Sequence, residues 1–134
     1  MIQMEKINMI KKKPVVIISL LMVLVLSLCA CEPDFVGNKY KTKNKYVLSF
    51  SALNKTEKEE LYLEKGDGLE VSIELTEGEV SLLISSPEGE EYYKGNGLSN
   101  GKFTVTVERD GRCRIWVTGE KAKGSLSFRR IKSE

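Results

Sequence analysis

Apolar and polar residues alternate along most of this chain from Tyr46 onward, with a period of two instead of the 3.6 of a helix. The clearest stretch is 69–75, where Glu, Ser and Glu separate four apolar residues. Turn signals such as Pro87-Glu88-Gly89 and Asp110-Gly111 divide the stretches. Further turns are expected at 77–78 and 119–124. The pattern therefore predicts about eight short strands, at 46–52, 61–63, 69–75, 80–84, 90–94, 103–107, 113–117 and 126–128.

Strands with one apolar and one polar face bury their apolar side chains only by packing two such faces together. The chain is therefore predicted to be all-β, with a single antiparallel, jelly-roll-like β-sandwich of two small sheets. A closed barrel is the alternative. The strongest strands predict the inner faces of the sandwich, which are Leu69/Val71/Ile73/Leu75 and Phe103/Val105/Val107.

The N-terminal part has a different pattern. Lys11-Lys12-Lys13 precede a run of 14 apolar residues, Val15–Leu28, and small residues follow before Cys31. A charged start, an apolar run and a small-residue cleavage point are typical of a secretory signal peptide. An uncleaved anchor is the alternative, but the 16 residues from Val15 to Ala30 are fewer than the roughly 20 that a spanning helix needs.

The segment Leu28-Cys29-Ala30-Cys31 resembles the lipobox of bacterial lipoproteins, with Cys31 at the position after cleavage. The resemblance implies that the thiol of Cys31 is diacylated (a palmitate-type modification), that the signal peptide is removed, and that the new amino group is often acylated too. It implies a lipoprotein of the cell envelope, anchored in the cell membrane on the extracytoplasmic side. Ordinary secretion remains an alternative, and the true start is Met1 or Met9.

Three segments follow from these patterns: a signal peptide at 1–30, a lipidated cysteine with a flexible tether at 31–45, and a β-sandwich domain at 46–131. The tether is polar and carries Lys39, Lys41, Lys43 and Lys45. These lysines are either solvated or in contact with anionic headgroups, at about 1 kcal/mol each at best.

Net charge changes once the signal peptide is set aside. The whole chain has 21 basic and 19 acidic residues, and residues 1–30 contain four lysines and one glutamate, which leaves 17 basic and 18 acidic residues. This balance argues against nucleic acid as a partner. Acidic residues gather in 57–91 and basic residues in 92–132. Pairing between neighbouring strands is the favoured explanation, and a face directed at an anionic envelope polymer is the alternative.

The candidate chemistry is sparse. The chain has no histidine, which removes the usual general base and histidine-based metal sites. Glutamates such as Glu57/Glu59/Glu60 alternate with apolar residues or lie at turns, as on a solvated strand face, so we expect no enzyme and no cofactor. We also expect no metal, because no Asp-x-Asp-x-Asp spacing occurs; a calcium site with oxygen ligands from Gly66-Asp67-Gly68 and 88–91 is the alternative. Cys113 has no disulfide partner once Cys29 and Cys31 are assigned to the lipobox region. A small buried side chain is the favoured interpretation of Cys113, and a reactive thiol is the alternative.

The stretch 61–130 contains Lys65-Gly66-Asp67, the Pro87-Glu88-Gly89 turn and the late strand Arg112–Val117. In this order the motifs resemble those of Golgi-dynamics (GOLD) domains and related jelly-roll sandwiches. Cys113 stands where that family usually has an aromatic residue. The resemblance implies a binding or adaptor sandwich without catalytic residues, and it carries no site residue over to this chain.

Strand parity suggests a binding surface. Trp116, the only tryptophan, is in register with Arg114 and opposite the apolar set of its strand, so it is expected to face away from the core together with one of Tyr92 and Tyr93. An exposed tryptophan beside an arginine is suited to stacking on a sugar ring or anchoring a protein. The alternative is a Trp116 half covered by its neighbours. We therefore expect a non-catalytic module that binds an envelope protein or glycan, or else a structural or accessory subunit of an assembly at the membrane.

Overall fold

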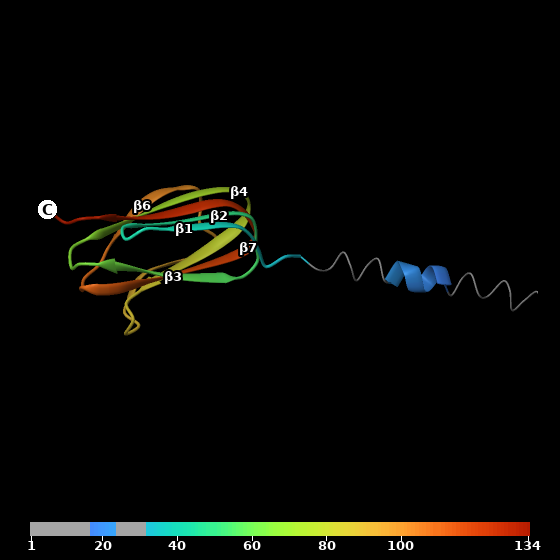
Figure 1. Ribbon diagram of the computed structural model, residues 1–134, viewed down its shortest axis with the longest axis horizontal. Coiled ribbons are helices and arrows are strands. Elements are labelled where there is room, and N and C mark those ends of the chain that lie inside the picture. Colours follow the sequence, from blue (N-terminus) through green and yellow to red (C-terminus); the bar gives the residue numbers. More distant parts are fainter. Residues whose placement is uncertain (1–16, 24–31) are drawn as a thin grey trace, which may run out of the picture. The chain divides into compact units, whose positions relative to one another are not determined.

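The structure is a computed structural model that describes residues 17–23 and 32–134. Residues 17–23 form a short helix, and no helix of the described segments is long and apolar enough to cross a membrane. Cys29, Cys31 and most of the predicted signal peptide lie outside the described residues. The chain divides into Met1–Glu32 and a compact unit, Pro33–Glu134, which contains all the strands described below (Figure 1).

The unit Pro33–Glu134 is built of seven antiparallel strands, so the predicted all-β class is confirmed. Two of the strands, β4 and β7, have 18 and 21 residues and are much longer than the others. The bounds are β1 (Phe35–Lys41), β2 (Lys45–Leu53), β3 (Thr56–Leu63), β4 (Gly68–Ser85), β5 (Glu91–Gly95), β6 (Gly101–Thr106) and β7 (Gly111–Ile131).

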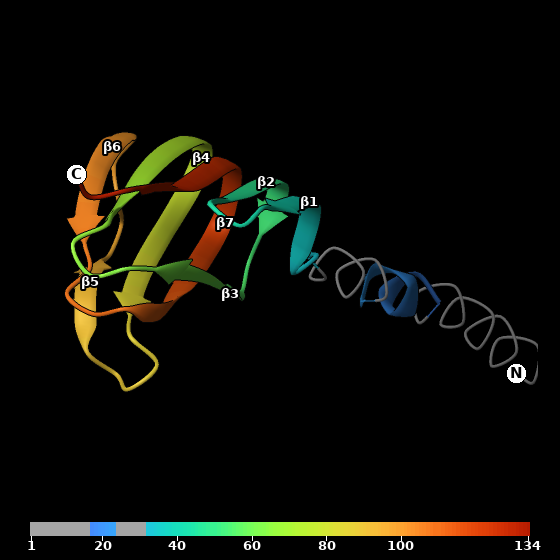
Figure 2. The same ribbon diagram turned by 60° about the vertical axis from the view of Figure 1, so that its left-hand side comes forward.

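The long strands β4 and β7 pair with each other over most of their length and pass from one layer of the sandwich to the other (Figure 2). In the first layer, the C-terminal part of β7 pairs with β2 and the N-terminal part of β4 pairs with β6; β1 lies outside β2. In the second layer, the N-terminal part of β7 pairs with β3 and the C-terminal part of β4 pairs with β5. The two layers are therefore parts of one continuous sheet that folds over onto itself.

The predicted turns at 77–78 and 119–124 are bends within β4 and β7, which explains why two pairs of predicted strands merge. The register between the two strands shifts on both sides of Glu77, as in a β-bulge. Gly78 has a φ of 76°, and a Cβ there would lie 2.3 Å from the carbonyl oxygen of Lys121. Only glycine allows the two backbones to approach this closely at the bend.

The predicted tether at 31–45 is wrong for much of its length, because Phe35–Lys41 is strand β1. β1 lies at the edge of the first layer, and every side chain except Phe35 is exposed, so its sequence lacks an apolar face. The start of the domain is fixed by Asn54, whose side-chain amide donates to the carbonyl of Pro33 at 3.1 Å. The backbone N–H of Asn54 donates to the carbonyl of Asp34 at 2.7 Å. The ordered domain thus begins at Pro33 instead of residue 46.

The core fills the space between the two layers. Leu69, Val71, Ile73, Val105 and Val107 are buried as predicted, whereas Leu75 and Phe103, at the ends of their runs, are only partly buried. Aliphatic side chains dominate the core, and Tyr46 and Phe128 stack with ring centroids 5.8 Å apart. The remaining buried apolar residues are Leu48, Phe50, Leu53, Leu61, Leu63, Val80, Leu82, Ile84, Cys113, Ile115, Val117, Ala122 and Leu126.

Candidate functional site

The outer face of the second layer carries a row of four residues, one from each strand. Lys94 of β5 lies opposite Leu83 of β4, Leu83 opposite Trp116 of β7, and Trp116 opposite Lys58 of β3. We call this set the Trp116 row. Its central pair is half-buried and apolar, and both ends are exposed lysines. Since adjacent strands lie about 4.8 Å apart, the row places an aromatic platform between two cationic groups.

Trp116 faces away from the core, in agreement with the parity prediction. Its neighbours Ile115 and Val117 are buried, at 1% and 0% exposure, and point to the other side of the strand. The indole of Trp116 is itself half-buried, as in the alternative of a tryptophan half covered by its neighbours, and not fully exposed. The ammonium of Lys58 lies 3.9 Å from its ring centroid. Such a cation–π contact is worth about 0.5–1 kcal/mol at an exposed site. The indole N–H is buried and donates no hydrogen bond to any described residue.

A hollow of about 370 Å³ lies along the Trp116 row. Its polar groups are hydroxyls, one amide and two ammonium groups, and none of the described residues that line it carries a carboxylate. The hydroxyls of Thr56 and Thr118 are 2.8 Å apart on its floor strands. The hollow thus offers an apolar ring together with hydrogen-bonding groups that donate and accept. Its lining residues are Thr56, Lys58, Ser81, Leu82, Leu83, Lys94, Asn96, Trp116 and Thr118.

Arg114 lies on the same face as Trp116, and the two residues line a second hollow of about 220 Å³. The guanidinium Nε of Arg114 donates to Oε1 of Glu60 at 3.3 Å, and Nη1 of Arg112 lies 3.4 Å from the other oxygen of the same carboxylate. Two arginines therefore share one glutamate, which leaves positive charge uncompensated beside the tryptophan.

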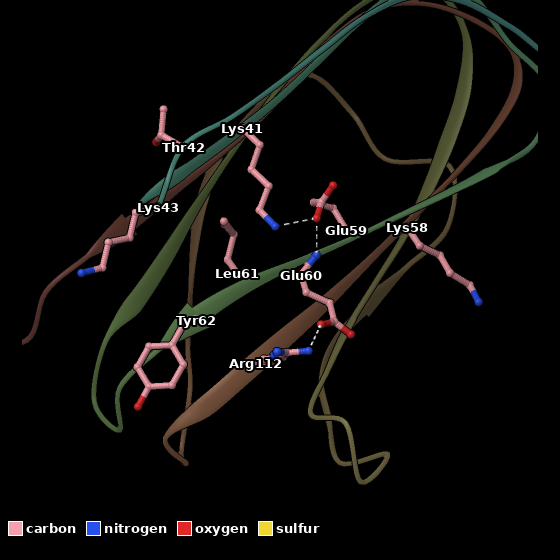
Figure 3. Close-up of a pocket in the computed structure, with 9 residues that line it drawn as sticks. All are labelled: Lys41, Thr42, Lys43, Lys58, Glu59, Glu60, Leu61, Tyr62 and Arg112. Atoms are coloured by element: carbon pink, nitrogen blue, oxygen red, sulfur yellow. Dashed lines mark hydrogen bonds and ion pairs between the residues drawn. The ribbon is translucent and has the colours of Figure 1, made fainter.

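A third hollow, of about 540 Å³, lies where the turn between β1 and β2 approaches β3 (Figure 3). Lys41 reaches toward Glu59, and Arg112 reaches toward Glu60. Lys43 and Lys58 extend to opposite sides of the hollow (Figure 3). Thr42, Leu61 and Tyr62 complete its lining.

Tyr92 and Tyr93 do not join the Trp116 row, and the expectation that one of them faces away from the core is wrong. Both are half-buried and pack against the core. Tyr93 lies opposite Ile84, and its ring centroid is 4.7 Å from that of Phe103. The register shifts beside Ile84, and Tyr92 has no partner in it. Such a bulge breaks the alternation of faces, so two consecutive tyrosines both turn inward.

Cys113 is a buried free thiol, as favoured from the sequence. Burial raises the pKa of the Cys113 thiol to about 12, so the reactive thiolate is suppressed at neutral pH. Tyr92 and Cys113 both line a separate hollow of about 200 Å³ near the Pro87 turn. The flanking arginines point to the opposite face of β7 and pair with Glu60.

The predicted pairing of acidic and basic strands is confirmed. Arg129 of β7 pairs with Glu70 of β4 at 3.2 Å, and Arg130 pairs with Asp67 at 2.7 Å. Asp67 also accepts the backbone N–H groups of Glu64 and Ser133. These hydrogen bonds from backbone amides and from Arg130 hold the pKa of the Asp67 carboxyl below its usual value.

Charge is also paired on the inner face of β3. Glu57 and Glu59 point between the layers, where Lys39 and Lys41 of β1 donate to them, the second pair at 2.8 Å. Lys55 lies 3.1 Å from the other oxygen of Glu57. Burial raises the pKa of Glu57, but the hydrogen bonds and charges of Lys39 and Lys55 outweigh it, and the pKa lies below its ordinary value. Two of the predicted tether lysines therefore close one side of the sandwich.

Lys58, Leu83 and Lys94 are members of the row that the sequence analysis missed. Leu83 and Lys94 have the parity of an outer face in their strands, but only the cross-strand register brings them beside Trp116. No protein-family model matches this chain, and no curated protein is significantly similar to it.

Proposed function

We propose that this protein is a lipid-anchored component of the cell envelope whose β-sandwich binds an envelope glycan without catalysing a reaction. The observation that carries the proposal is the Trp116 row, a half-buried indole between two lysines beside hydroxyl and amide groups. A sugar ring presents apolar C–H groups to an aromatic face and hydroxyls to its surroundings. The indole of Trp116 suits the C–H groups of a sugar, and the hydroxyl, amide and ammonium groups around it suit the sugar hydroxyls.

A binding role is favoured over catalysis by the state of the carboxylates nearest the row. Glycoside hydrolysis needs two carboxyl groups about 5–10 Å apart that flank the substrate and change protonation state. Glu57 and Glu59 turn inward to lysines, and Glu60 is shared by two arginines. In each case an ion pair engages carboxylate oxygens that catalysis would need.

Attachment at Cys31 rests on the order of charged, apolar and small residues that ends in Ala30-Cys31. Two or three acyl chains, at about 0.8 kcal/mol per buried CH₂, make release from the membrane negligible. Mass spectrometry of the native protein tests this: we expect an N-terminal Cys31 carrying acyl groups. An unmodified Cys31 still joined to Ala30 would rule the anchor out.

A second candidate, a structural or accessory subunit, is favoured by the edge strand β1. Val36 and Tyr40 on β1 are 47% and 60% exposed, and the strand has one hydrogen-bonding edge without a partner among the described residues. Open edges and exposed apolar side chains are where another chain adds on. A pull-down from solubilised membranes separates the two: a stoichiometric protein partner favours the subunit, and retention on glycans favours recognition.

The variant Trp116→Ala tests the glycan proposal, with Tyr40→Ala as the matched exposed aromatic on another strand. We expect Trp116→Ala to abolish retention on a glycan array while the melting temperature changes by only a few degrees, and Tyr40→Ala to keep retention. Trp116→Phe should restore part of the binding, because it keeps an aromatic face. Unchanged retention by Trp116→Ala would reject the proposal. A loss of about 3–5 kcal/mol of stability would instead identify Trp116 as a core residue.

A further inference from the structure

The three hollows along β3 share one lining residue and follow the strand at its open edge, so side chains of both its faces contribute to them. Lys58 contributes to each of them, and Glu59 and Glu60 line the two that lie away from the Lys94 end. We refer to the three together as the β3 groove. The Trp116 row lies at one end of this groove, and Lys43, Tyr62 and Arg112 lie at the other.

The groove is strongly cationic although the domain is not. Six basic and two acidic side chains line it, whereas residues 31–134 have 17 basic and 18 acidic residues. Both acidic side chains are engaged in ion pairs within the groove. Lys43, Lys58 and Lys94 form no ion pair with any residue that the structure describes. The basic residues are Lys41, Lys43, Lys58, Lys94, Arg112 and Arg114.

The unpaired cations are spread out and do not converge on one point. Lys43 and Lys58 extend to opposite sides of the 540 Å³ hollow (Figure 3). Lys58 lies opposite Trp116 and Tyr62 lies opposite Arg112, so these two cross-strand pairs are four residues apart on β3. At about 3.4 Å per residue this separation is about 14 Å. A single small anion would meet only one lysine here, whereas a chain with repeated charges would meet several.

We propose that the ligand of the β3 groove is a linear anionic polysaccharide, whose carboxylate or phosphate groups pair with Lys43, Lys58 and Lys94 while one sugar stacks on Trp116. This inference rests on the proposed glycan-binding function and specifies the class of its ligand. The ammonium of Lys58 lies over the indole in the unbound protein. A polymer charge draws that ammonium aside and opens the ring to the sugar.

A single-stranded nucleic acid is the other polyanion that pairs with lysines and stacks on aromatic rings. Its usual binding surface combines a basic groove with several aromatic platforms for successive bases. The groove has two aromatic side chains, Trp116 and Tyr62, which lie about four residues apart along the strands, about 14 Å and too far for successive stacked bases. Hydroxyl-bearing side chains surround Trp116. The polysaccharide is therefore the better fit, and nucleic acid becomes an outcome of the test.

The test uses the full-length protein in detergent and the fluorescence of its only tryptophan, Trp116. The probes are polygalacturonate, its neutral methyl ester, phosphorylated mannan, unphosphorylated mannan and a thymidine oligonucleotide. We expect polygalacturonate, phosphorylated mannan or both to change the emission, with affinity that falls as salt rises, and each neutral polymer to bind at least tenfold more weakly. Which anionic polymer binds identifies the charged group.

The lysine variants sharpen the assignment. Lys43→Gln, Lys58→Gln and Lys94→Gln should each weaken binding about fivefold, the loss of one solvent-exposed charge contact of about 1 kcal/mol. Lys102→Gln, an exposed lysine of β6 outside the groove, should leave it unchanged.

Equal binding of charged and neutral polymers, or tighter binding of the oligonucleotide, would overturn the assignment of ligand class. So would the absence of any emission change with all four polysaccharides. In each case Trp116→Ala decides separately whether the row binds glycans at all. If that variant still loses retention on the glycan array, the proposed function stands and only the ligand class is wrong.

Discussion

The two faces of β3 carry charge in opposite ways. On the inner face, Glu57 and Glu59 each accept hydrogen bonds from a lysine of β1 and join the two layers. On the outer face, Lys58 lies over Trp116 and has no carboxylate partner among the described residues. Consecutive residues of a strand point to opposite sides. Neighbouring residues of β3 therefore have different roles: the charges of Glu57 and Glu59 stabilise the fold, and the charge of Lys58 is open to a ligand.

The largest difference in the free energy of unfolding is expected between alanine substitutions at Leu61 and Tyr62. Leu61 is 2% exposed in the core, whereas Tyr62 is 50% exposed on the outer face. Leu61→Ala should lower the free energy of unfolding by about 2–5 kcal/mol, because it leaves a cavity, and Tyr62→Ala by about 0.5 kcal/mol or less. Chemical denaturation of both variants measures this. Equal losses would show that the faces of β3 are wrongly assigned.

The next largest difference in stability is expected between glutamate substitutions on the two faces of β3. Glu57→Gln leaves Lys39 and Lys55 beside a neutral, buried side chain, so we expect a loss of about 2–3 kcal/mol. Glu60→Gln removes an exposed pair with Arg112 and Arg114 and should cost about 0–1 kcal/mol. Denaturation at neutral pH compares them. A larger loss for Glu60→Gln would contradict the view that the inner pairs stabilise the fold.

Acid should weaken the ion pairs of the inner face of β3. Burial raises the pKa of Glu59, but the hydrogen bonds of Lys41 and of the Glu60 backbone outweigh it, so the pKa values of Glu57 and Glu59 both lie below their ordinary 4.5 in the folded state. Groups with a lowered folded pKa contribute stability above their unfolded pKa and lose it as pH falls through the folded value. The melting temperature should therefore fall below about pH 4.5, and less steeply in Glu57→Gln. An identical slope in that variant would exclude Glu57 as a source.

The smallest effect concerns the contact of Lys58 with Trp116. Lys58→Gln removes a cation–π contact worth about 0.5–1 kcal/mol, so stability should change little. The indole should become more accessible, and quenching of its emission by acrylamide should increase. Lys94→Gln, at the other end of the row, is the control and should leave quenching unchanged. If Lys58→Gln has no effect on quenching, Lys58 does not cover the ring in solution.

The sequence predicted those parts of the fold that a two-residue period controls. It located most strands, the core residues of β4 and the outward orientation of Trp116, because burial of one face fixes parity. It could not predict β1, whose exposed side chains hold no pattern and whose position depends on backbone pairing with β2. It misplaced Tyr92 and Tyr93 because a bulge shifts the register beside Ile84. The sequence could not place Lys58 and Lys94 in the row either, because only the pairing register of the strands decides which residues are cross-strand neighbours.

The hydrogen bonds of Asn54 to Pro33 and Asp34 have a consequence for how far the domain can range. An extended chain spans at most about 3.5 Å per residue. If Cys31 is acylated, Pro33, the first residue fixed by these hydrogen bonds, would therefore lie no more than about 7 Å from it. A domain linked to its anchor by so few residues can change its orientation but cannot move far from the membrane. Thr56, at one end of the groove, follows Asn54 by two residues. If Cys31 is acylated as proposed, that end of the groove would stay beside the bilayer, within reach of polymers that lie at the lipid surface.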